Sequence, residues 1–568
     1  MSAAAAQQPT PTEKPATAGV PLEKCVVSGQ VVKAGSGEPL KKARVVLRKE
    51  EGRETPRVEL VDSNGRFQFK DVEPGRYRVY AVRNGYVRQE YGQRSPNHPG
   101  TALALVAGQQ VKDVVFKLVP AAVIAGRIYD EDGEPVASAR VQAQQYRYMQ
   151  GKRQLVPMRF ATTNDRGEYR LIGLPAGRYT VSATFSPMMT LGLGFEAAGQ
   201  AMGNEGYAPT YYPNTNDAAR ATPVEVRAGN EVGGIDFLLL PTRAVRIRGR
   251  VYNAVLGKPG RDIWLMIFPA ATGGAWSFGP DNQARVNETD GSFEFGGVTP
   301  GTYNLFANWS DNDRTSYTAR QLVEVGASDV DGVTLTIQAG VDLHGTVRSE
   351  GKTTGANNEQ EASAPEQAGE KKLELSDLRV LFERSDQEFI RFGGREFARV
   401  QDDGSYRLQN VSDDRYRVLV GQLPPDYYLK SARLDGNDVL EEGLTVSGPP
   451  QGPLELIISP NGGQVEGSVL KDGKPFSGAA VTLVPEERRR ERRELSKTAT
   501  TDQYGRFALR GLAPGTYQLY AWEEIEPGAH QDSEFLKPYA KLGHEVKVEE
   551  GNRLSAELKL IPAGDPPR

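Results

Sequence analysis

One spacing recurs five times along this chain: a glycine precedes a tyrosine by twelve residues, between a tight turn and an alternating apolar segment. The five pairs are Gly65 and Tyr77, Gly167 and Tyr179, Gly291 and Tyr303, Gly404 and Tyr416, and Gly505 and Tyr517. Successive glycines are 102, 124, 113 and 101 residues apart. Solenoid repeats are much shorter, at about 20 to 50 residues. The constant internal spacing with variable gaps therefore predicts five tandem folded units.

Each copy also contains the strand signals of a β-sandwich. A first strand carries glycine between apolar residues (VSGQVV, IAGRIY, IRGRVY, LHGTVR and VEGSVL), and a strand such as VVFKL or AELKL closes the unit. The tyrosine begins a strand with its ring inside and its hydroxyl near a corner, similar to the tyrosine corner of immunoglobulin-like sandwiches. Together these signals predict an all-β chain of seven-stranded antiparallel β-sandwiches, transthyretin- or immunoglobulin-like.

The repeats place the unit boundaries. We expect residues 1–23 to form a disordered N-terminal tail. The five units that follow are expected at residues 24–119, 120–241, 242–339, 340–459 and 460–562. Unit four carries a polar insert at 350–372, expected to be disordered. The short junctions predict an elongated multidomain chain, reaching roughly 170 Å for five globules end to end.

The order of these motifs resembles the carboxypeptidase regulatory-like domain family. The resemblance rests on five motifs in a fixed order, over about residues 24–562. They are G-x-V, G-x-P, an A-x-V strand, D-x-x-G before an aromatic residue, and P-G-x-Y. Unit four departs from it, with Asp413 and Asp414 where the other units have a glycine turn. The resemblance implies a transthyretin-like, carbohydrate-binding-like sandwich that acts mostly as a non-catalytic module.

Nothing in the sequence predicts catalysis. The four histidines, His98, His344, His530 and His544, begin no zinc-binding motif, and no nucleophile elbow or phosphate-binding loop occurs. Asp62, Asp165, Asp290, Asp403 and Asp502 are interpreted as turn caps, because a calcium loop needs alternating oxygen ligands over about a dozen residues. We therefore expect no enzyme activity, no metal and no cofactor.

Aromatic side chains are the candidate ligand groups, because a flat ring offers an apolar face to a sugar or to a partner's side chain. The candidates lie beside polar, turn-forming residues: Trp276, Trp309, Trp522, Tyr207, Tyr211 and Tyr212. Burial in a core is the alternative interpretation for each of them.

Two further segments interrupt the pattern. The apolar loop at 186–209 contains Met188, Met189, Leu191, Leu193 and Phe195, and it predicts either a partner contact or packing against a neighbouring unit. The charge run at 486–494, EERRRERRE, is nearly neutral overall and is expected to be a solvated loop or helical turn.

The bulk composition bears on localisation and partners. The net charge of −4 argues against nucleic acid as a partner, and no apolar run is long enough to span a membrane. The Ala-rich start followed by Gln-Gln suggests an exported protein from which a leader was removed. With a single cysteine, Cys25, no intrachain disulfide can form.

Three functions remain open from the sequence, and the oligomeric state is not predicted. The first is a non-catalytic binding or spacer protein at the cell surface or in the periplasm, with a glycan or a surface protein as its partner. The second is a purely structural stalk or adhesin. The third is an accessory subunit of a peptidase or transporter.

Overall fold

The computed structural model describes residues 23–50, 55–95, 99–149, 151–185, 205–270, 283–312, 315–351, 373–384 and 397–564. Nearly all regular structure in these ranges is β-strand, as the sequence predicts. No helix in them is long and apolar enough to cross a membrane. The predicted tail at 1–23, apart from its last residue, and nearly all of the insert at 350–372 lie outside the described residues.

Short strands make up most of units one and two. Unit one contains β1 (Cys25–Lys33), β2 (Arg44–Lys49), β3 (Arg57–Leu60), β4 (Arg66–Val72), β5 (Gly75–Val82), β6 (Gln89–Glu90), β7 (Leu103–Leu105) and β8 (Gln110–Leu118). Unit two contains β9 (Ala122–Tyr129), β10 (Arg140–Met149), β11 (Lys152–Thr162), β12 (Glu168–Leu174), β13 (Gly177–Thr184), β14 (Glu205–Tyr207), β15 (Thr210–Tyr211), η1 (Ala218–Arg220), β16 (Val224–Val226), β17 (Glu231–Val232) and β18 (Phe237–Leu238). The short β19 (Pro241–Arg243) lies at the junction with unit three.

Unit three contains β20 (Val245–Asn253), β21 (Trp264–Pro269), β22 (Gln283–Arg285), β23 (Ser292–Val298), β24 (Gly301–Ser310), β25 (Ser316–Val325) and β26 (Val330–Ile337). Unit four contains β27 (Val341–Ser349), η4 (Leu375–Asp377), β28 (Arg379–Arg384), β29 (Phe397–Arg399), β30 (Ser405–Val411), β31 (Asp414–Gly421), β32 (Tyr428–Leu434), β33 (Asn437–Asp438), β34 (Leu444–Val446) and β35 (Leu454–Ser459). Unit five contains β36 (Gly463–Lys471), β37 (Lys474–Pro475), β38 (Ala480–Pro485), η5 (Glu487–Arg489), η6 (Arg493–Leu495), β39 (Lys497–Thr500), β40 (Arg506–Leu512), β41 (Gly515–Trp522), η7 (Ala529–Gln531), α3 (Ser533–Leu536), η8 (Lys537–Leu542), β42 (His544–Val548) and β43 (Arg553–Lys559).

The units share one sandwich topology. In unit one, β1 lies between β4 and β8, while β2 and β5 are central in the second sheet. Units three and five repeat this plan with β23-β20-β26 and β22-β21-β24-β25, and with β40-β36-β43 and β39-β38-β41-β42. One detail differs from the sequence prediction: the first and last strands of a unit pair in parallel, as β1 and β8 do, and the remaining ladders are mostly antiparallel.

The glycine in each first strand is required by close backbone approach. A Cβ on Gly29 would lie 1.9 Å from the carbonyl oxygen of Val114, on the parallel partner strand. The other first-strand glycines face a backbone carbonyl of the segment that runs parallel to them. They are Gly126, Gly249, Gly345 and Gly467, at 2.1, 2.0, 2.2 and 1.8 Å. Any larger residue must push these two strands apart, so the glycine allows the sheet to close.

The tyrosine corners are present in all five units. The hydroxyls of Tyr77, Tyr179, Tyr416 and Tyr517 donate to the backbone carbonyl four residues earlier, at 2.8 to 2.9 Å. Tyr303 instead pairs with the hydroxyl of Thr299, also four residues earlier, at 2.9 Å. Unit four therefore forms its corner without the glycine turn. The repeat glycines Gly65, Gly167, Gly291, Gly404 and Gly505 all have φ between 70° and 85°, as the predicted turn requires.

In the described residues, five large apolar clusters each fall within one predicted unit. They span Cys25–Leu118, Ala122–Leu239, Val245–Ile337, Leu343–Ile458 and Val465–Leu558. Because each cluster lies between the two sheets of its own unit, we propose that the unit boundaries expected from the sequence are the domain boundaries.

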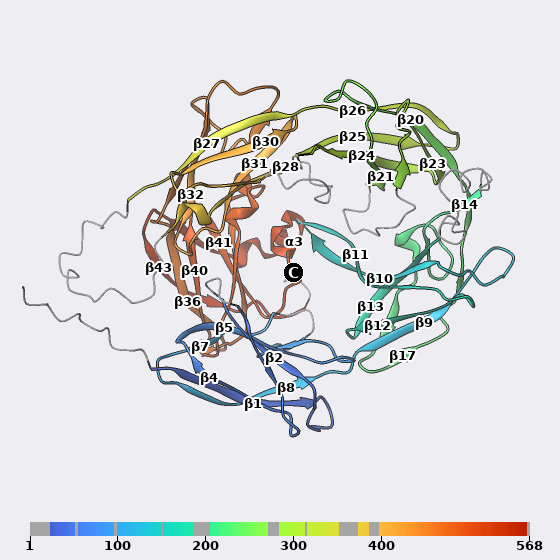
Figure 1. Cartoon of the computed structure of the whole chain (residues 1–568). Helices are drawn as coiled ribbons and strands as arrows, with labels where there is room; N and C mark the ends of the chain where they lie inside the picture. Colours follow the sequence, from blue (N-terminus) through green and yellow to red (C-terminus); the bar gives the residue numbers. More distant parts are fainter. Residues whose placement is uncertain are drawn as a thin grey trace, which may run out of the picture.

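The units form a closed ring rather than a string (Figure 1). Unit one lies beside unit five, and the backbone of Ala102 bridges that of Asp502. The predicted elongated arrangement is thus wrong, because it assumed that only consecutive units touch. Each unit turns one of its two sheets towards the inside of the ring (Figure 1). From unit one to unit five, these inner sheets are the ones that contain β2, β10, β21, β28 and β41.

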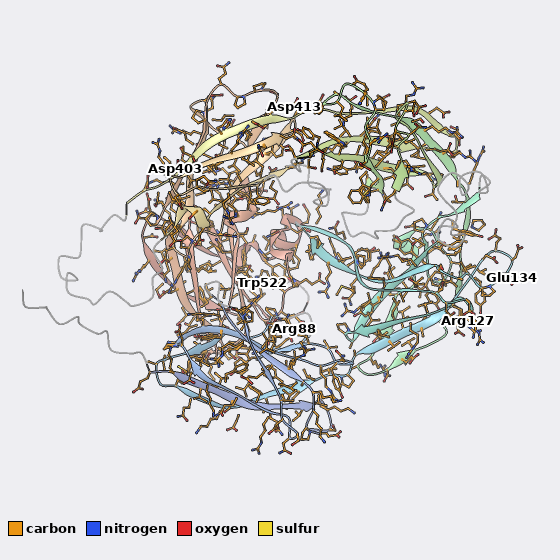
Figure 2. All side chains as sticks on the ribbon, in the orientation of Figure 1. Arg88, Arg127, Glu134, Asp403, Asp413 and Trp522 are labelled. Carbon is orange, nitrogen blue, oxygen red and sulfur yellow. The ribbon has the colours of Figure 1, made fainter. Side chains whose placement is uncertain are left out.

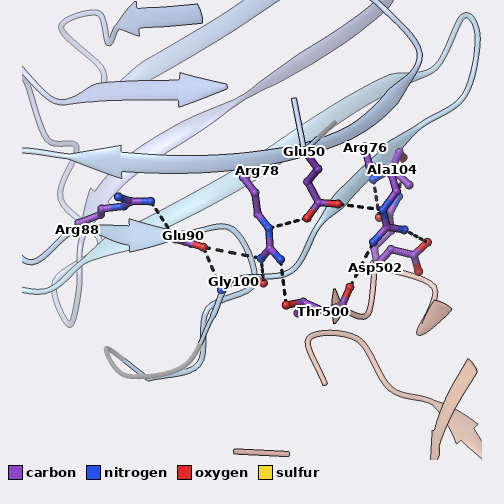
Figure 3. Close-up of polar contacts among 10 residues, drawn as sticks. Glu50, Arg76, Arg78, Arg88, Glu90, Gly100, Ala104, Thr500 and Asp502 are labelled. Atoms are coloured by element: carbon purple, nitrogen blue, oxygen red, sulfur yellow. Dashed lines mark hydrogen bonds and ion pairs between the residues drawn. The ribbon is translucent and has the colours of Figure 1, made fainter. Parts of the chain in front are cut away.

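Arginines on β5 form the ring closure between units one and five (Figure 3). Arg78 donates to the hydroxyl of Thr500 at 3.0 Å, and Arg76 donates to the Thr500 carbonyl at 3.3 Å. Glu50 holds both guanidinium groups, at 2.7 Å from Arg78 and 3.0 Å from Arg76. The side-chain amide of Gln503 pairs with both backbone groups of Ala104.

A short helical insert between β41 and β42 braces the ring from the inside (Figure 1). It includes α3 and covers the inner sheet of unit five, burying Trp522. Across the ring, the aromatic ring of Phe535 in α3 contacts Tyr148 of β10, with centroids 5.7 Å apart. His530 of the insert is buried, and this burial lowers the pKa of its imidazole to about 4.

The charge run at 486–494 forms the helical turns η5 and η6, one of the two predicted alternatives, and these turns contact unit four. The Arg492 guanidinium is buried and lies 2.5 Å from the Glu441 carboxylate of unit four. Arg489 contacts the same carboxylate at 3.0 Å. The sequence did not indicate this contact, because Glu441 lies about 50 residues before the two arginines in the chain.

The close contact between a first-strand glycine and the carbonyl of the parallel strand gives a first prediction. Replacing Gly249 with Ala should destabilise unit three by about 1–3 kcal/mol, because the added carbon meets the Val333 carbonyl. Gly296, which has open space around its Cβ position, is the matched control for the same change. Urea unfolding with hydrogen exchange resolved over residues 245–337 measures both. Equal stability of the two variants would contradict the close approach.

The ring closure gives a second prediction. The double variant R76Q/R78Q should speed amide exchange of Ala104, because its partner Gln503 is then held less firmly. R88Q is the control, since Arg88 pairs with Glu90 inside unit one. If both variants exchange at the wild-type rate, these arginines do not hold the ring.

The buried histidine gives a third prediction. In the unfolded chain a histidine has a pKa of about 6.5, whereas His530 stays neutral in the fold down to about pH 4. Its contribution to stability is therefore complete above about pH 6.5 and is lost as the pH falls towards 4, by up to about 3 kcal/mol. Urea unfolding at pH 7.5 and 4.5 should show a larger loss for the wild type than for H530Q. An equal loss would mean that this histidine is protonated in the fold.

Candidate functional site

Two of the predicted aromatic residues pack in unit interiors. Trp522 is 2% exposed, its indole N–H donates to the Thr482 hydroxyl at 3.0 Å, and Tyr539 lies 4.8 Å away centroid to centroid. Figure 2 shows Trp522 on the inner side of unit five, where the insert covers it. Trp309 is half-buried against the core of unit three and contacts Tyr317. Both indoles are thus occupied by packing.

Other predicted residues lie outside the described part of the chain. They are Trp276 and the loop residues Met188, Met189, Leu191, Leu193 and Phe195.

The three predicted tyrosines of unit two separate onto different surfaces. Tyr212 packs against the core residue Phe237, and the hydroxyl of Tyr207 donates to Glu131 at 2.6 Å. Tyr211 pairs with Ser182 across the sheet, on the face away from the core. Of the three, Tyr211 is the one placed on the inner face.

Strand register places four side chains in one row across the inner sheet of unit two. Phe160 of β11 lies opposite Gln142 of β10, Gln142 lies opposite Ser182 of β13, and Ser182 lies opposite Tyr211 of β15. Val141 and Ala143 on either side of Gln142 belong to the core, so alternation directs Gln142 to the inner side. We call Phe160, Gln142, Ser182 and Tyr211 the inner row.

The inner row has an aromatic residue at each end, Phe160 exposed and Tyr211 half-buried, and two buried polar residues between them. Phe160 is 65% exposed, whereas Gln142 and Ser182 are 7% and 5% exposed. The Ser182 hydroxyl donates to Gln144 at 3.4 Å, and the Gln142 amide lies beside it in the same row. Burial raises the pKa of the Tyr211 phenol, helped by nearby Tyr146 and Asp217, so this group stays a neutral donor.

A side-chain amide has two donor N–H groups and an acceptor oxygen, so Gln142 offers both kinds of hydrogen bond on the inner face. A ligand on the inner row can therefore donate to Gln142 or accept from it. An exposed ring at Phe160 supplies apolar contact at the same place. The row can therefore recognise a molecule that has both hydroxyl groups and an apolar face.

The acidic and histidine side chains were also compared with metal-binding arrangements, within the residues that the structure describes. They contain no group of three or more histidine, cysteine or acidic side chains able to hold a metal ion. The recurring acids act instead in turns: Asp62 accepts from the backbone of Asn64 and Arg66, both at 2.8 Å. In unit two that position is taken by Asn164, one residue before the predicted Asp165.

Sequence reasoning missed Gln142, Phe160 and the neighbouring Tyr146. The signal was available in the alternation of ARVQAQQY, which puts Val141 and Ala143 on one face and Gln142 and Gln144 on the other. The placement of Phe160 needed the hairpin register, which shifts at a bulge between Ala143 and Gln144.

Three regions of the chain match one family model, described as the carboxypeptidase regulatory-like domain: residues 26–119, 123–193 and 464–532. The chain carries carboxypeptidase regulatory-like domains at these regions. The resemblance drawn from the sequence motifs is thereby confirmed, and the inner row lies within the second matched region except for Tyr211. The search of curated proteins gives no match to this chain.

Solved structures with similar folds are remote in sequence. The Bacillus anthracis TIE protein is 14% identical with a TM-score of 0.15, over 55% of this chain and 51% of its own, so this chain spans about half of that protein. The minor pilin of Streptococcus agalactiae is 13% identical, with a TM-score of 0.22 over 38% and 97%. Two B repeat units of the Staphylococcus aureus collagen binding protein are 12% identical, with a TM-score of 0.13 over 77% and 99%.

Proposed function

We propose that this protein is an exported, non-catalytic scaffold that binds a carbohydrate on the inner face of unit two. The inner row supports this proposal most directly. It combines the exposed ring of Phe160 and the half-buried ring of Tyr211 with the amide of Gln142, which lies between them in the row. Sugars present apolar C–H faces beside hydroxyl groups, and this combination matches the row.

The closed ring favours a scaffold over a stalk. A stalk gains reach with each added unit, but here unit five returns to unit one through Thr500 and Asp502. A braced ring instead holds its inner surfaces in fixed positions, which lowers the entropic cost of binding. Carboxypeptidase regulatory-like domains in the matched regions agree with a non-catalytic role.

The proposal predicts that binding depends on the inner row. The intact chain should bind glycans on an array, and F160A should weaken that binding about tenfold or more, the effect of losing one central aromatic contact. F397A is the matched control, because Phe397 is an exposed phenylalanine on the inner sheet of unit four.

The melting curves of both variants should match the wild type, which separates lost binding from lost folding. Absence of glycan binding by the wild type would refute the proposal. Equal glycan binding by F160A and the wild type would place the site elsewhere.

A further inference from the structure

The last strand of unit three has an open edge. On one side β26 pairs with β20, and no strand pairs with its other side in the part of the chain that the structure describes. Successive residues of a strand turn their backbone N–H and C=O groups to opposite edges. The Val333 carbonyl points to β20, where it lies against Gly249. Thr334 and Thr336 therefore turn their backbone groups to the open edge.

The other four units protect the equivalent edge. The register with the first strand gives the residues equivalent to Thr336 in units one, two, four and five, which are Lys117, Leu238, Ile457 and Lys559. The two lysines are exposed, and charged side chains of this kind oppose the pairing of an edge with another chain. In unit two the Asn214 side chain accepts from the Leu238 N–H at 2.8 Å. In unit four β32 pairs with β35.

The edge of β26 carries none of these protections among the described residues. Residues 332–341, GVTLTIQAGV, contain no charged side chain. Thr334 and Thr336 are exposed, and β26 lies on the outer side of the ring (Figure 1). The Thr334 hydroxyl contacts only the Gly332 carbonyl of its own strand, at 3.5 Å. An uncharged segment that alternates threonine with large apolar residues is typical of strands that pair with another chain.

Unit four shows that the fold accommodates a further strand at this edge. There β32 runs antiparallel to β35, with Ser431 opposite Ile457. Ile457 is equivalent to Thr336, so β32 occupies the place that is open beside β26. An antiparallel strand added to β26 would therefore extend the outer sheet of unit three as β32 extends that of unit four.

We propose that β26 pairs with β26 of a second copy of this chain. A two-fold axis at Leu335 places Thr334 of each copy opposite Thr336 of the other. Each such pair exchanges two backbone N–H to C=O hydrogen bonds, and its two threonine side chains are neighbours on the solvent face. A two-fold contact needs a self-complementary surface, and an uncharged strand of alternating threonines supplies one. This inference is independent of the carbohydrate site.

The contact is short, so the pairing is expected to be weak and reversible. Stable interfaces bury about 1,600 Å² in total, and one strand pair from Val333 to Ile337 buries much less. We therefore expect half of the chains to be paired at about 10 to 100 µM.

Sedimentation velocity of the intact chain tests the pairing, over about 1 to 300 µM. The average mass of the wild type should rise from that of one chain towards that of two. T334K/T336K should stay monomeric, because each pair then places a lysine directly opposite a lysine. T334E/T336E should stay monomeric for the same reason.

An equimolar mixture of the lysine and glutamate variants controls for folding and for register. Each lysine then lies opposite a glutamate, so the mixture should form a dimer that contains one chain of each kind. Because neither variant pairs alone, such a dimer forms only if both are folded and if residues 334 and 336 face each other.

Three outcomes would overturn the proposal. The first is a wild type that stays monomeric over the whole range. If that monomer binds a labelled peptide of residues 330–339, the edge accepts an extended peptide instead of a second ring. The second is self-association that T334K/T336K leaves unchanged, which would place the contact elsewhere. The third is a mixture of the two charged variants that stays monomeric although each variant melts as the wild type does.

Discussion

The contact between unit five and unit one determines the shape of this protein, because it converts a row of sandwiches into a ring. The contact uses the turn that precedes β4 in unit one and β40 in unit five, which every unit carries at the corresponding place. In unit five the Oδ1 atom of Asp502 accepts from the backbone of Tyr504 and Arg506 at 2.9 Å, as Asp62 does in unit one. Asp62 is exposed, whereas Asp502 is 2% exposed because the turn of unit five is docked against unit one.

Ring closure gives the two sheets of a unit different environments. The outer sheets face solvent, and the inner sheets face one another across the ring. In unit five that inner sheet is covered by its own insert, where Tyr520 and Trp522 are buried. In unit two Phe160 stays exposed with Arg140 stacked on its ring, so this part of the inner sheet is not covered by the insert.

The sequence was sufficient for the architecture of a unit. Glycine at positions such as Gly29, and tyrosine twelve residues after Gly65, are imposed by local backbone geometry, and local constraints are visible in local patterns. The ring was not predictable in this way. It depends on pairs such as Arg78 and Thr500, which are 422 residues apart.

The same distinction applies to the candidate site. Tyr211 could be proposed from its neighbours, but Gln142 and Phe160 become neighbours of Tyr211 only through the register of four strands. The burial of Trp522 likewise depends on an insert whose path the apolar pattern does not specify.

Small-angle X-ray scattering of the intact chain in solution tests the central claim most directly. A closed ring of five units, each with a radius of gyration near 13 Å, gives an overall radius of gyration of about 30 Å, whereas a straight string of the same units gives about 50 Å. The account predicts the smaller value at low concentration, where the chain is monomeric. A value near that of the string would show that units one and five are apart, and would remove the shared inner surface on which the proposed binding scaffold depends.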